Sequence, residues 1–422
     1  MLWLGVALLA AALCVRLVWQ NRTGPAQPIT AALGMDDSRA ELPLAPPGVP
    51  ADNAAALKAA RERLDRAAAD TTLQGKERLA AAALGMGDLW RAEAAACSAL
   101  KIAPKDRSAR LTLAASLRQQ DRFDPASMIY RQLIAEDRHD SDAYLGMADT
   151  MFAANRRPDA FAWLARAASD GAQTALSLTT IAHRYQDWKD YPKAEETAGR
   201  ALKAAPDDID ARLELASIQV ESGRLDDARH SLDAILTQDP KNGLAYRLLG
   251  VVLMNATYSR QDLNGARRVL ERAVELNPRD PNIYSAAAVV YREQRLYRLA
   301  AQAYDALLQL DPTSLEGRYG LGQVYGLLSK PELSRRQLAL YEQLDERQRR
   351  VTRLSEDALH NPRQAGKHAA LARYLESSGD YARALPQYQT AAGLDPNDRG
   401  IQRDLTRFYA RLGWGKPVHE SQ

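Results

Sequence analysis

The first twenty residues of the chain are apolar, in contrast to the rest of the sequence. The run from Leu2 to Trp19 is interrupted by a single charged residue, Arg16. Eighteen residues of helix measure about 27 Å, which is close to the ~30 Å hydrocarbon core of a bilayer. The pattern therefore predicts a membrane-spanning segment within residues 1–22, with Trp3 and Trp19 near its two ends, where indole rings favour the interface.

A cleaved secretory signal is the alternative explanation of this segment. Such a signal usually begins with positive charges and ends in a small-residue cleavage site, and neither feature is present here. Arg16 and Arg22 favour a cytoplasmic location for the residues that follow, but two charges are a small bias. We expect a single-pass N-terminal anchor, and the side of the membrane that carries the remaining chain stays open.

Residues 23–52 are predicted to form a linker. They contain six of the chain's 20 prolines, and their few apolar residues show no sustained period. A Pro-rich stretch of this length is a semi-rigid tether with a reach of up to about 90 Å. It would hold the next domain away from the bilayer. A leading helix is expected at 53–72.

From residue 73 onwards, apolar positions follow a helical period, and the whole pattern repeats. Short proline-containing segments end successive helices, and the distance between these prolines is 34 residues or a multiple of 34 in four cases. The prolines are Pro104, Pro206, Pro240, Pro278, Pro312, Pro362 and Pro396. A fixed step of this size indicates an array of helical repeats.

Small residues recur in two series with the same step. The first series, in the middle of a first helix, is Ala80, Ala114, Ala148, Ala182, Ala216, Gly250, Ala288, Gly322 and Ala372. The second series, near the start of a second helix, is Ala92, Ala126, Ala160, Ala194, Ala228, Ala266, Ala300, Ser334 and Ala384. Small side chains at these points allow two antiparallel helices to approach closely. Gly87, Gly223 and Gly379 are expected to form turns with positive φ between paired helices.

These features resemble the tetratricopeptide repeat family. The resemblance implies an all-α fold, a right-handed α-solenoid of stacked antiparallel helix pairs. Nine repeats are expected over residues 73–398, with insertions near 255–262 and 347–362, followed by a C-terminal capping helix and tail at 399–422. The second insertion is expected to lengthen one helix from Pro331 to about Leu359, because its apolar residues keep a helical stripe.

The resemblance also implies a concave groove, lined by the first helices, that accepts a peptide or helix from a protein partner. The residues carried onto this groove are Leu145, Asp149, Phe152, His183, Asp187, Leu213, Val220, Arg247, Met254, Arg292 and Tyr319. For each apolar member, packing against adjacent helices is the alternative. The family's carboxylate-clamp subgroup uses Lys and Asn at positions where this chain has Leu111, Leu145 and Leu213, so clamp-type binding is not expected.

Composition excludes several other classes of protein. The chain has 422 residues and a formal net charge of +3, which gives no strong field for nucleic acid. Its two cysteines cannot build a disulfide scaffold or a cysteine zinc site. The cluster of Arg347, Arg349, Arg350 and Arg353 has acidic neighbours on the same predicted helix, so we interpret it as a solvated surface.

Catalytic motifs are not found in the sequence. The six histidines are scattered without an HExxH pair, and no GxSxG elbow is present. The spacing of Gly320, Gly322 and Gly326 does not match a phosphate-binding loop. His183 and Asp187 lie one helical turn apart and are interpreted as a solvated polar pair. We therefore predict no enzymatic activity, no cofactor and no metal.

The sequence favours a membrane-tethered scaffold that binds protein or peptide partners and supports complex assembly; a homo-oligomer is possible. The alternative is an exported or periplasmic assembly factor, or chaperone, for envelope polymer export or secretion. Both would use the same fold, and the partner cannot be named from the sequence.

Overall fold

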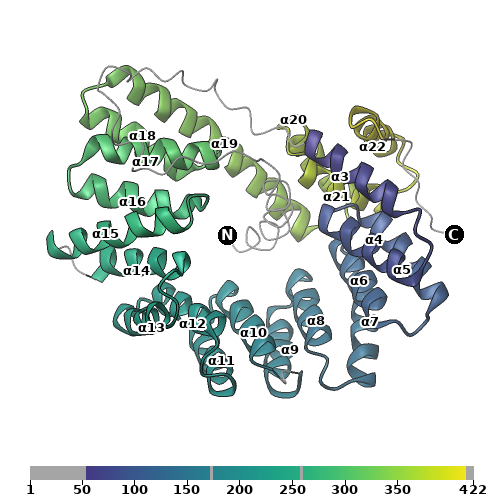
Figure 1. The fold of residues 1–422 in the computed structure, drawn as a ribbon. Helices are drawn as coiled ribbons and strands as arrows, with labels where there is room; N and C mark the ends of the chain where they lie inside the picture. The colour runs from purple at the N-terminus through teal and green to yellow at the C-terminus, as the bar shows by residue number, and fades with distance from the viewer. Residues whose placement is uncertain (1–53, 172–173, 257–259, 415–422) are drawn as a thin grey trace. The chain divides into compact units, whose positions relative to one another are not determined.

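The computed structural model describes residues 54–171, 174–256 and 260–414, and no strand occurs among these residues. Figure 1 shows their helices, which are connected by short turns. The helices are α3 (Ala54–Ala67), α4 (Leu73–Met86), α5 (Leu89–Ile102), α6 (Arg107–Gln119), α7 (Phe123–Glu136), α8 (Ser141–Ala153), α9 (Arg157–Arg166), the π-helix η2 (Ala167–Gly171), α10 (Ala175–Asp187), α11 (Tyr191–Ala204), α12 (Ile209–Glu221), α13 (Leu225–Gln238), α14 (Gly243–Ala256), α15 (Arg260–Leu276), α16 (Pro281–Glu293), α17 (Tyr297–Leu310), α18 (Leu315–Leu327), α19 (Pro331–His360), α20 (Ala365–Ser377), α21 (Tyr381–Leu394) and α22 (Arg399–Arg411).

Successive helices pack as antiparallel pairs, each made of an even-numbered first helix and an odd-numbered second helix. In the described part of the chain these pairs run from α4 with α5 to α20 with α21. The small residues predicted at the seam are buried: Ala114, Ala148 and Ala216 all have 0% exposure. The predicted all-α solenoid of stacked helix pairs is confirmed.

The helix ends follow from local sequence. Aspartates begin many first helices; the Asp208 side chain, for example, accepts hydrogen bonds from the backbone N–H groups of Asp210 at 2.9 Å and Ala211 at 3.1 Å. The turns inside the pairs need a residue with positive φ. Gly223 provides φ +80° and Gly379 provides +77°, as predicted.

Glycines inside the first helices allow large side chains to approach the helix backbone. A Cβ atom on Gly320 would lie 2.2 Å from Cζ of Tyr304, which packs on α18 from α17. A Cβ atom on Gly146 of α8 would likewise lie 2.2 Å from Cε1 of Tyr130, which packs on α8 from α7. Gly320 is therefore a packing residue, and so is Gly322, where a Cβ atom would lie 2.8 Å from the Leu338 side chain.

The chain divides into two compact units. Among the described residues, unit 1 comprises 54–171 and 349–414, and unit 2 comprises 174–256 and 260–348. Helix α19 covers the sequence boundary and ends at His360, within one residue of the end predicted from its apolar stripe. None of the helices that the structure describes is both long and apolar enough to cross a membrane. The predicted anchor, Leu2 to Trp19, lies outside the described residues.

In unit 1, helices from the beginning and from the end of the repeat array share one hydrophobic core. Leu57, Leu79 and Trp90 belong to the same buried cluster as Leu405 and Phe408. Burial of apolar surface stabilises such a core by roughly 25 cal/mol per Å² removed from water. The solenoid therefore does not end in two separate capping surfaces within this unit, since each end covers the other.

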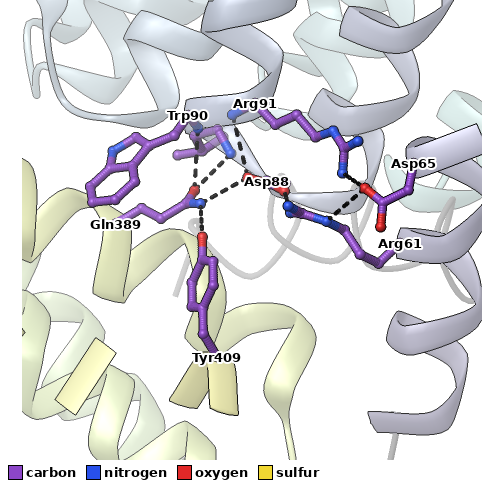
Figure 2. Close-up of polar contacts among 8 residues, drawn as sticks. Arg61, Asp65, Asp88, Trp90, Arg91, Gln389 and Tyr409 are labelled. Carbon is purple, nitrogen blue, oxygen red and sulfur yellow. Dashed lines mark hydrogen bonds and ion pairs between the residues drawn. The ribbon is translucent and has the colours of Figure 1, made fainter. Parts of the chain in front are cut away.

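Polar contacts also connect the two ends of the array in unit 1, as Figure 2 shows. The fully buried Gln389 of α21 accepts hydrogen bonds at Oε1 from the backbone N–H groups of Leu89, at 2.7 Å, and Trp90, at 3.4 Å. Its Nε2 donates to Asp88 Oδ1 and to the Tyr409 hydroxyl, both at 2.9 Å. Gln389 thus completes the N-terminal cap of α5, some 300 residues earlier in the chain.

Candidate partner-binding surface

Each first helix of unit 2 carries one stripe of side chains that are partly or fully exposed to solvent. If the N-cap residue is position 0, the stripe comprises positions 2, 5, 9 and 12 or 13, which are three or four residues apart and so lie on one side of a helix. In α10 these positions are Leu176, Thr179, His183 and Asp187. We call these positions on α10, α12, α14, α16 and α18 the first-helix face.

Hydrogen bonds connect neighbouring first helices across this face. In each case the two partners are 31 residues apart, three fewer than the repeat length. The contacts are His183 Nδ1 with Glu214 Oε1 at 3.1 Å, Gln186 Nε2 to Ser217 Oγ at 3.1 Å, Ser285 Oγ to Glu316 Oε1 at 2.6 Å, and Arg292 to Gln323 Oε1 at 3.3 Å. The repeat register therefore brings polar side chains of successive first helices within hydrogen-bonding distance, on the first-helix face and directly beside it.

His183 lies between two carboxylates, at 3.9 Å from Asp187 and 3.1 Å from Glu214. Its pKa lies above the ordinary value, chiefly because of the hydrogen bond to Glu214, and the charges of Glu214 and Asp187 act in the same direction. Arg184 and burial oppose this shift. His183 is thus charged over a wider pH range than a free histidine. Within the described ranges, no group of three or more His, Cys, Asp or Glu residues could hold a metal ion.

The basic residues predicted for the groove are held by neighbours. Arg247 forms an ion pair with Asp280 at 3.3 Å, and Asp280 is itself the N-cap of α16. Arg292 contacts Glu293 at 3.1 Å in addition to Gln323. The two arginine side chains are 22% and 30% exposed, so both ion pairs are partly accessible on the face.

Several large apolar side chains of unit 2 are exposed on its first helices. Leu176 is 74% exposed, Leu244 39%, Tyr319 45% and Leu327 53%. All four occupy positions of the first-helix face, and Tyr319 also contacts Tyr341 with ring centroids 5.2 Å apart. Exposed apolar groups that share one face are typical of interaction surfaces.

The other apolar residues predicted in unit 2 are half-buried. Leu213 and Val220 pack against a core cluster around Ala216, and Met254 packs against the cluster that contains Tyr291. They form the base of the first-helix face, because part of each side chain still reaches solvent.

The three predicted residues of unit 1 are placed differently. Leu145 is only 8% exposed and Phe152 only 9%, while Asp149 is half-buried. The guanidinium of Arg157 also lies 5.5 Å from the centre of the Phe152 ring. For Leu145 and Phe152 the low exposure favours the alternative stated for the apolar members, which is packing against adjacent helices.

Sequence reasoning missed Leu176 and Leu244, which both stand at position 2, and the polar partners Glu214 and Glu316. The 31-residue spacing would have found the two glutamates, since it is the repeat length minus one helical turn.

A pocket of about 330 Å³ lies elsewhere in unit 2, between α13, α14 and α15. Its lining residues are Arg229, Asp233, Leu249, Leu253, Gly265, Arg268 and Val269, none of which was predicted.

Comparison with known proteins places parts of the chain in repeat families. A tetratricopeptide repeat model matches residues 117–179 and 188–251, and a TPR repeat model matches residues 255–295. The chain is 29% identical over 124 residues to mouse Protein O-mannosyl-transferase TMTC1, which covers 28% of this chain and 13% of that protein. The human protein of the same name is 25% identical over 164 residues, covering 38% and 18%. The chain thus spans less than a fifth of the length of these relatives.

Solved structures of MamA are also similar. One is 20% identical and covers 40% of this chain and 97% of that chain, with a TM-score of 0.36. MamA from Desulfovibrio magneticus RS-1 is 17% identical and covers 42% and 97%, with a TM-score of 0.37. The 34-residue register, the stacked helix pairs and the matching family models together show that the chain contains tetratricopeptide repeats.

Proposed function

We propose that this chain is a protein-interaction scaffold and that a segment of its partner lies along the first-helix face of unit 2. The observation that carries the proposal is the exposure of Leu176, Leu244, Tyr319 and Leu327 on this one face. Leaving such side chains in water is unfavourable, and a partner that covers them would recover about 25 cal/mol per Å².

The residues of the face have different roles in this proposal. Tyr319 is the main anchor, because aromatic side chains that become fully desolvated carry much of the energy of an interface. Leu213, Val220 and Met254 supply the apolar base. His183 with Asp187 lies at one end of the face and Arg247 with Arg292 towards the other, and these different polar groups would set the direction of the bound segment.

We propose no catalytic role for the repeats. The similarity to the proteins named O-mannosyl-transferase covers 13% and 18% of their lengths, so it supports a shared repeat region and gives no support for a shared reaction. The exposed apolar side chains of the first-helix face support a scaffold.

We further propose that Leu2 to Trp19 tethers the scaffold to a membrane, on the strength of its apolar length. The full chain should then stay with membranes after alkaline carbonate washing, whereas a chain that starts at Ala51 should be released. A mature N-terminus mapped beyond residue 20 would instead show a cleaved signal. A reporter fused after Gln422 would identify the side of the membrane.

Site-specific photo-crosslinking tests the binding face. A photoreactive phenylalanine analogue placed at Leu176 or Tyr319 should crosslink to the same partner protein in intact cells. Met128 provides a matched control, because it is 60% exposed and lies on a second helix, α7. Crosslinks of that partner to position 128, with none to positions 176 and 319, would contradict the proposed face.

A further inference from the structure

A second charged surface lies on α22, the last helix of unit 1. Its apolar side chains Ile401, Leu405 and Phe408 are buried in the core of the unit. Arginines occur at every fourth residue on the opposite side of the helix, and all of them are exposed: Arg399, Arg403, Arg407 and Arg411. Successive members are about 6 Å apart along the helix axis, since each residue adds about 1.5 Å.

Two carboxylates beneath this row hold the guanidinium groups in place. Asp404 accepts from Arg373 of α20 at 2.6 Å and pairs with Arg407 at 3.2 Å. Glu376, also on α20, accepts a hydrogen bond from the Tyr388 hydroxyl at 2.6 Å. Its carboxylate lies 3.9 Å from Arg407 and 3.6 Å from Arg411. The two acids are 14% and 7% exposed, so a partner cannot easily reach them.

The arginines themselves remain accessible. The side chains of Arg373, Arg407 and Arg411 are 50%, 61% and 57% exposed despite their ion pairs. Arg403 is exposed and makes no ion pair with any residue that the structure describes. We call Arg373, Arg403, Arg407 and Arg411 the basic patch. Four guanidinium groups against two buried carboxylates leave this patch with a surplus of two positive charges.

We propose that the basic patch binds an acidic segment of a partner protein, with carboxylates spaced about 6 Å apart. Glutamates at every fourth residue of a helix have this spacing. Guanidinium groups bind carboxylates through two parallel hydrogen bonds, and the buried acids orient three of the four arginines before a partner arrives. Binding therefore costs little side-chain ordering at these three positions.

A protein segment fits this patch better than a nucleic acid or a membrane surface does. Three of the four arginines lie on the short helix α22, and the fourth, Arg373, lies on the adjacent helix α20. In nucleic-acid sites, by contrast, basic residues are usually distributed over a whole face of the protein. The net charge of the chain, +3, adds no broad positive field around the patch. A short row of paired guanidinium groups therefore favours a ligand with a few carboxylates at matching distances.

Fluorescence anisotropy with the full chain tests this inference. The first probe is an alanine-rich helical peptide with a fluorescein label and glutamates at every fourth residue. The second probe has the same composition with its glutamates clustered at one end. We expect the evenly spaced peptide to bind more tightly. The double substitution Arg403→Ser and Arg407→Ser should weaken its binding by about ten-fold or more.

Two further variants separate binding from folding. Arg403→Ser alone removes no ion pair, so it should reduce binding while circular dichroism shows unchanged unfolding. Arg131→Ser, at an exposed arginine of α7, should leave binding unchanged. Wild-type affinity in the double variant would overturn the proposal. Equally tight binding of the clustered peptide would also overturn it. So would a competition experiment in which polyuridylate RNA or phosphatidylglycerol vesicles displace the probe at lower concentrations than the unlabelled peptide does. Crosslinking from Tyr319 should be unaffected by these variants, because that face belongs to unit 2.

Discussion

At the residue scale, Asp305 shows how burial affects one charged group of unit 2. Burial raises the pKa of Asp305 to about 6, although the charge of Arg318 and the hydroxyl of Tyr325 act in the opposite direction. The folded state therefore holds this proton more tightly than the unfolded chain, whose carboxyl has a pKa near 3.8. The resulting stabilisation is complete below about pH 4 and is lost as the pH rises through about 6.

Replacing Asp305 with Asn should consequently change the pH dependence of stability. The amide stays neutral, and its oxygen can still accept a hydrogen bond from Tyr325. Relative to the wild type, the variant should gain on the order of 1 kcal/mol between about pH 5 and about pH 7.5. Thermal unfolding at the two pH values measures the gain. An equal difference between the proteins at both values would show that Asp305 does not titrate in this range.

Ala216 tests the packing at a helix seam. It has 0% exposure and lies in a cluster with Leu232 and Ile235. Ala216→Leu should cost about 1–3 kcal/mol, because extra methyl groups have no space there. Ala216→Arg should cost more, since it would bury an unpaired charge. Ala339→Leu, at an exposed position of α19, is the control and should change unfolding little. Unchanged unfolding of Ala216→Arg would mean that the assumed register is incorrect.

The sequence predicted which residues form the seams better than which residues form the binding face. Seam positions require small side chains on both helices, so composition reveals them. The face has no such requirement. Leu145 and Tyr319 both stand at position 5 of a first helix, yet one is 8% exposed and the other 45%. The difference depends on the size and orientation of neighbouring side chains, which the register alone cannot give.

At the element scale, helix ends were predictable wherever a single residue determines them. Gly223 and Gly379 adopt the positive φ that ends a first helix, and Pro331 begins α19. The π-helix η2, after α9, was not predicted. No proline follows α9 before Gly171. The local sequence therefore allows the helix to continue, here with the i→i+5 hydrogen bonds of a π-helix. Such a change in hydrogen-bond pattern leaves no clear signal in apolar spacing.

Two glycines in helix interiors should respond oppositely to the same substitution. Gly320→Ala should destabilise unit 2 by about 1–3 kcal/mol, because the new Cβ would meet Tyr304 at a distance that requires the ring to move. Gly199→Ala in α11 should stabilise by about 0.5–1 kcal/mol, since a Cβ there has nothing within 4 Å and alanine favours the helix. Denaturant unfolding of both variants provides the measurement. A stabilising effect of Gly320→Ala would contradict the close approach of α17 and α18.

At the scale of the whole molecule, the contact between the two ends of the repeat array in unit 1 was not foreseen. Repeat periodicity describes neighbours in sequence, and it predicts that terminal helices act as caps. Asp88 could be identified as an N-cap because it follows Gly87, but its partner Gln389 has no counterpart in the other repeats. A contact between residues 301 positions apart depends on the summed geometry of all intervening helices, which no local pattern contains.

Gln389 offers the sharpest test of this contact. Its amide uses both hydrogen-bonding sites of the oxygen and both hydrogens of the nitrogen, all in a buried environment. Gln389→Leu would leave the Leu89 and Trp90 N–H groups and Asp88 without this partner, at a cost of about 1–3 kcal/mol for each buried group left unsatisfied. We expect faster hydrogen exchange at the start of α5 and in α22, with little change in α12 to α16. Gln402→Leu, at a half-buried position of α22, serves as the control. Unchanged exchange of the Leu89 and Trp90 amides in Gln389→Leu would show that the two ends are held together by their apolar core alone.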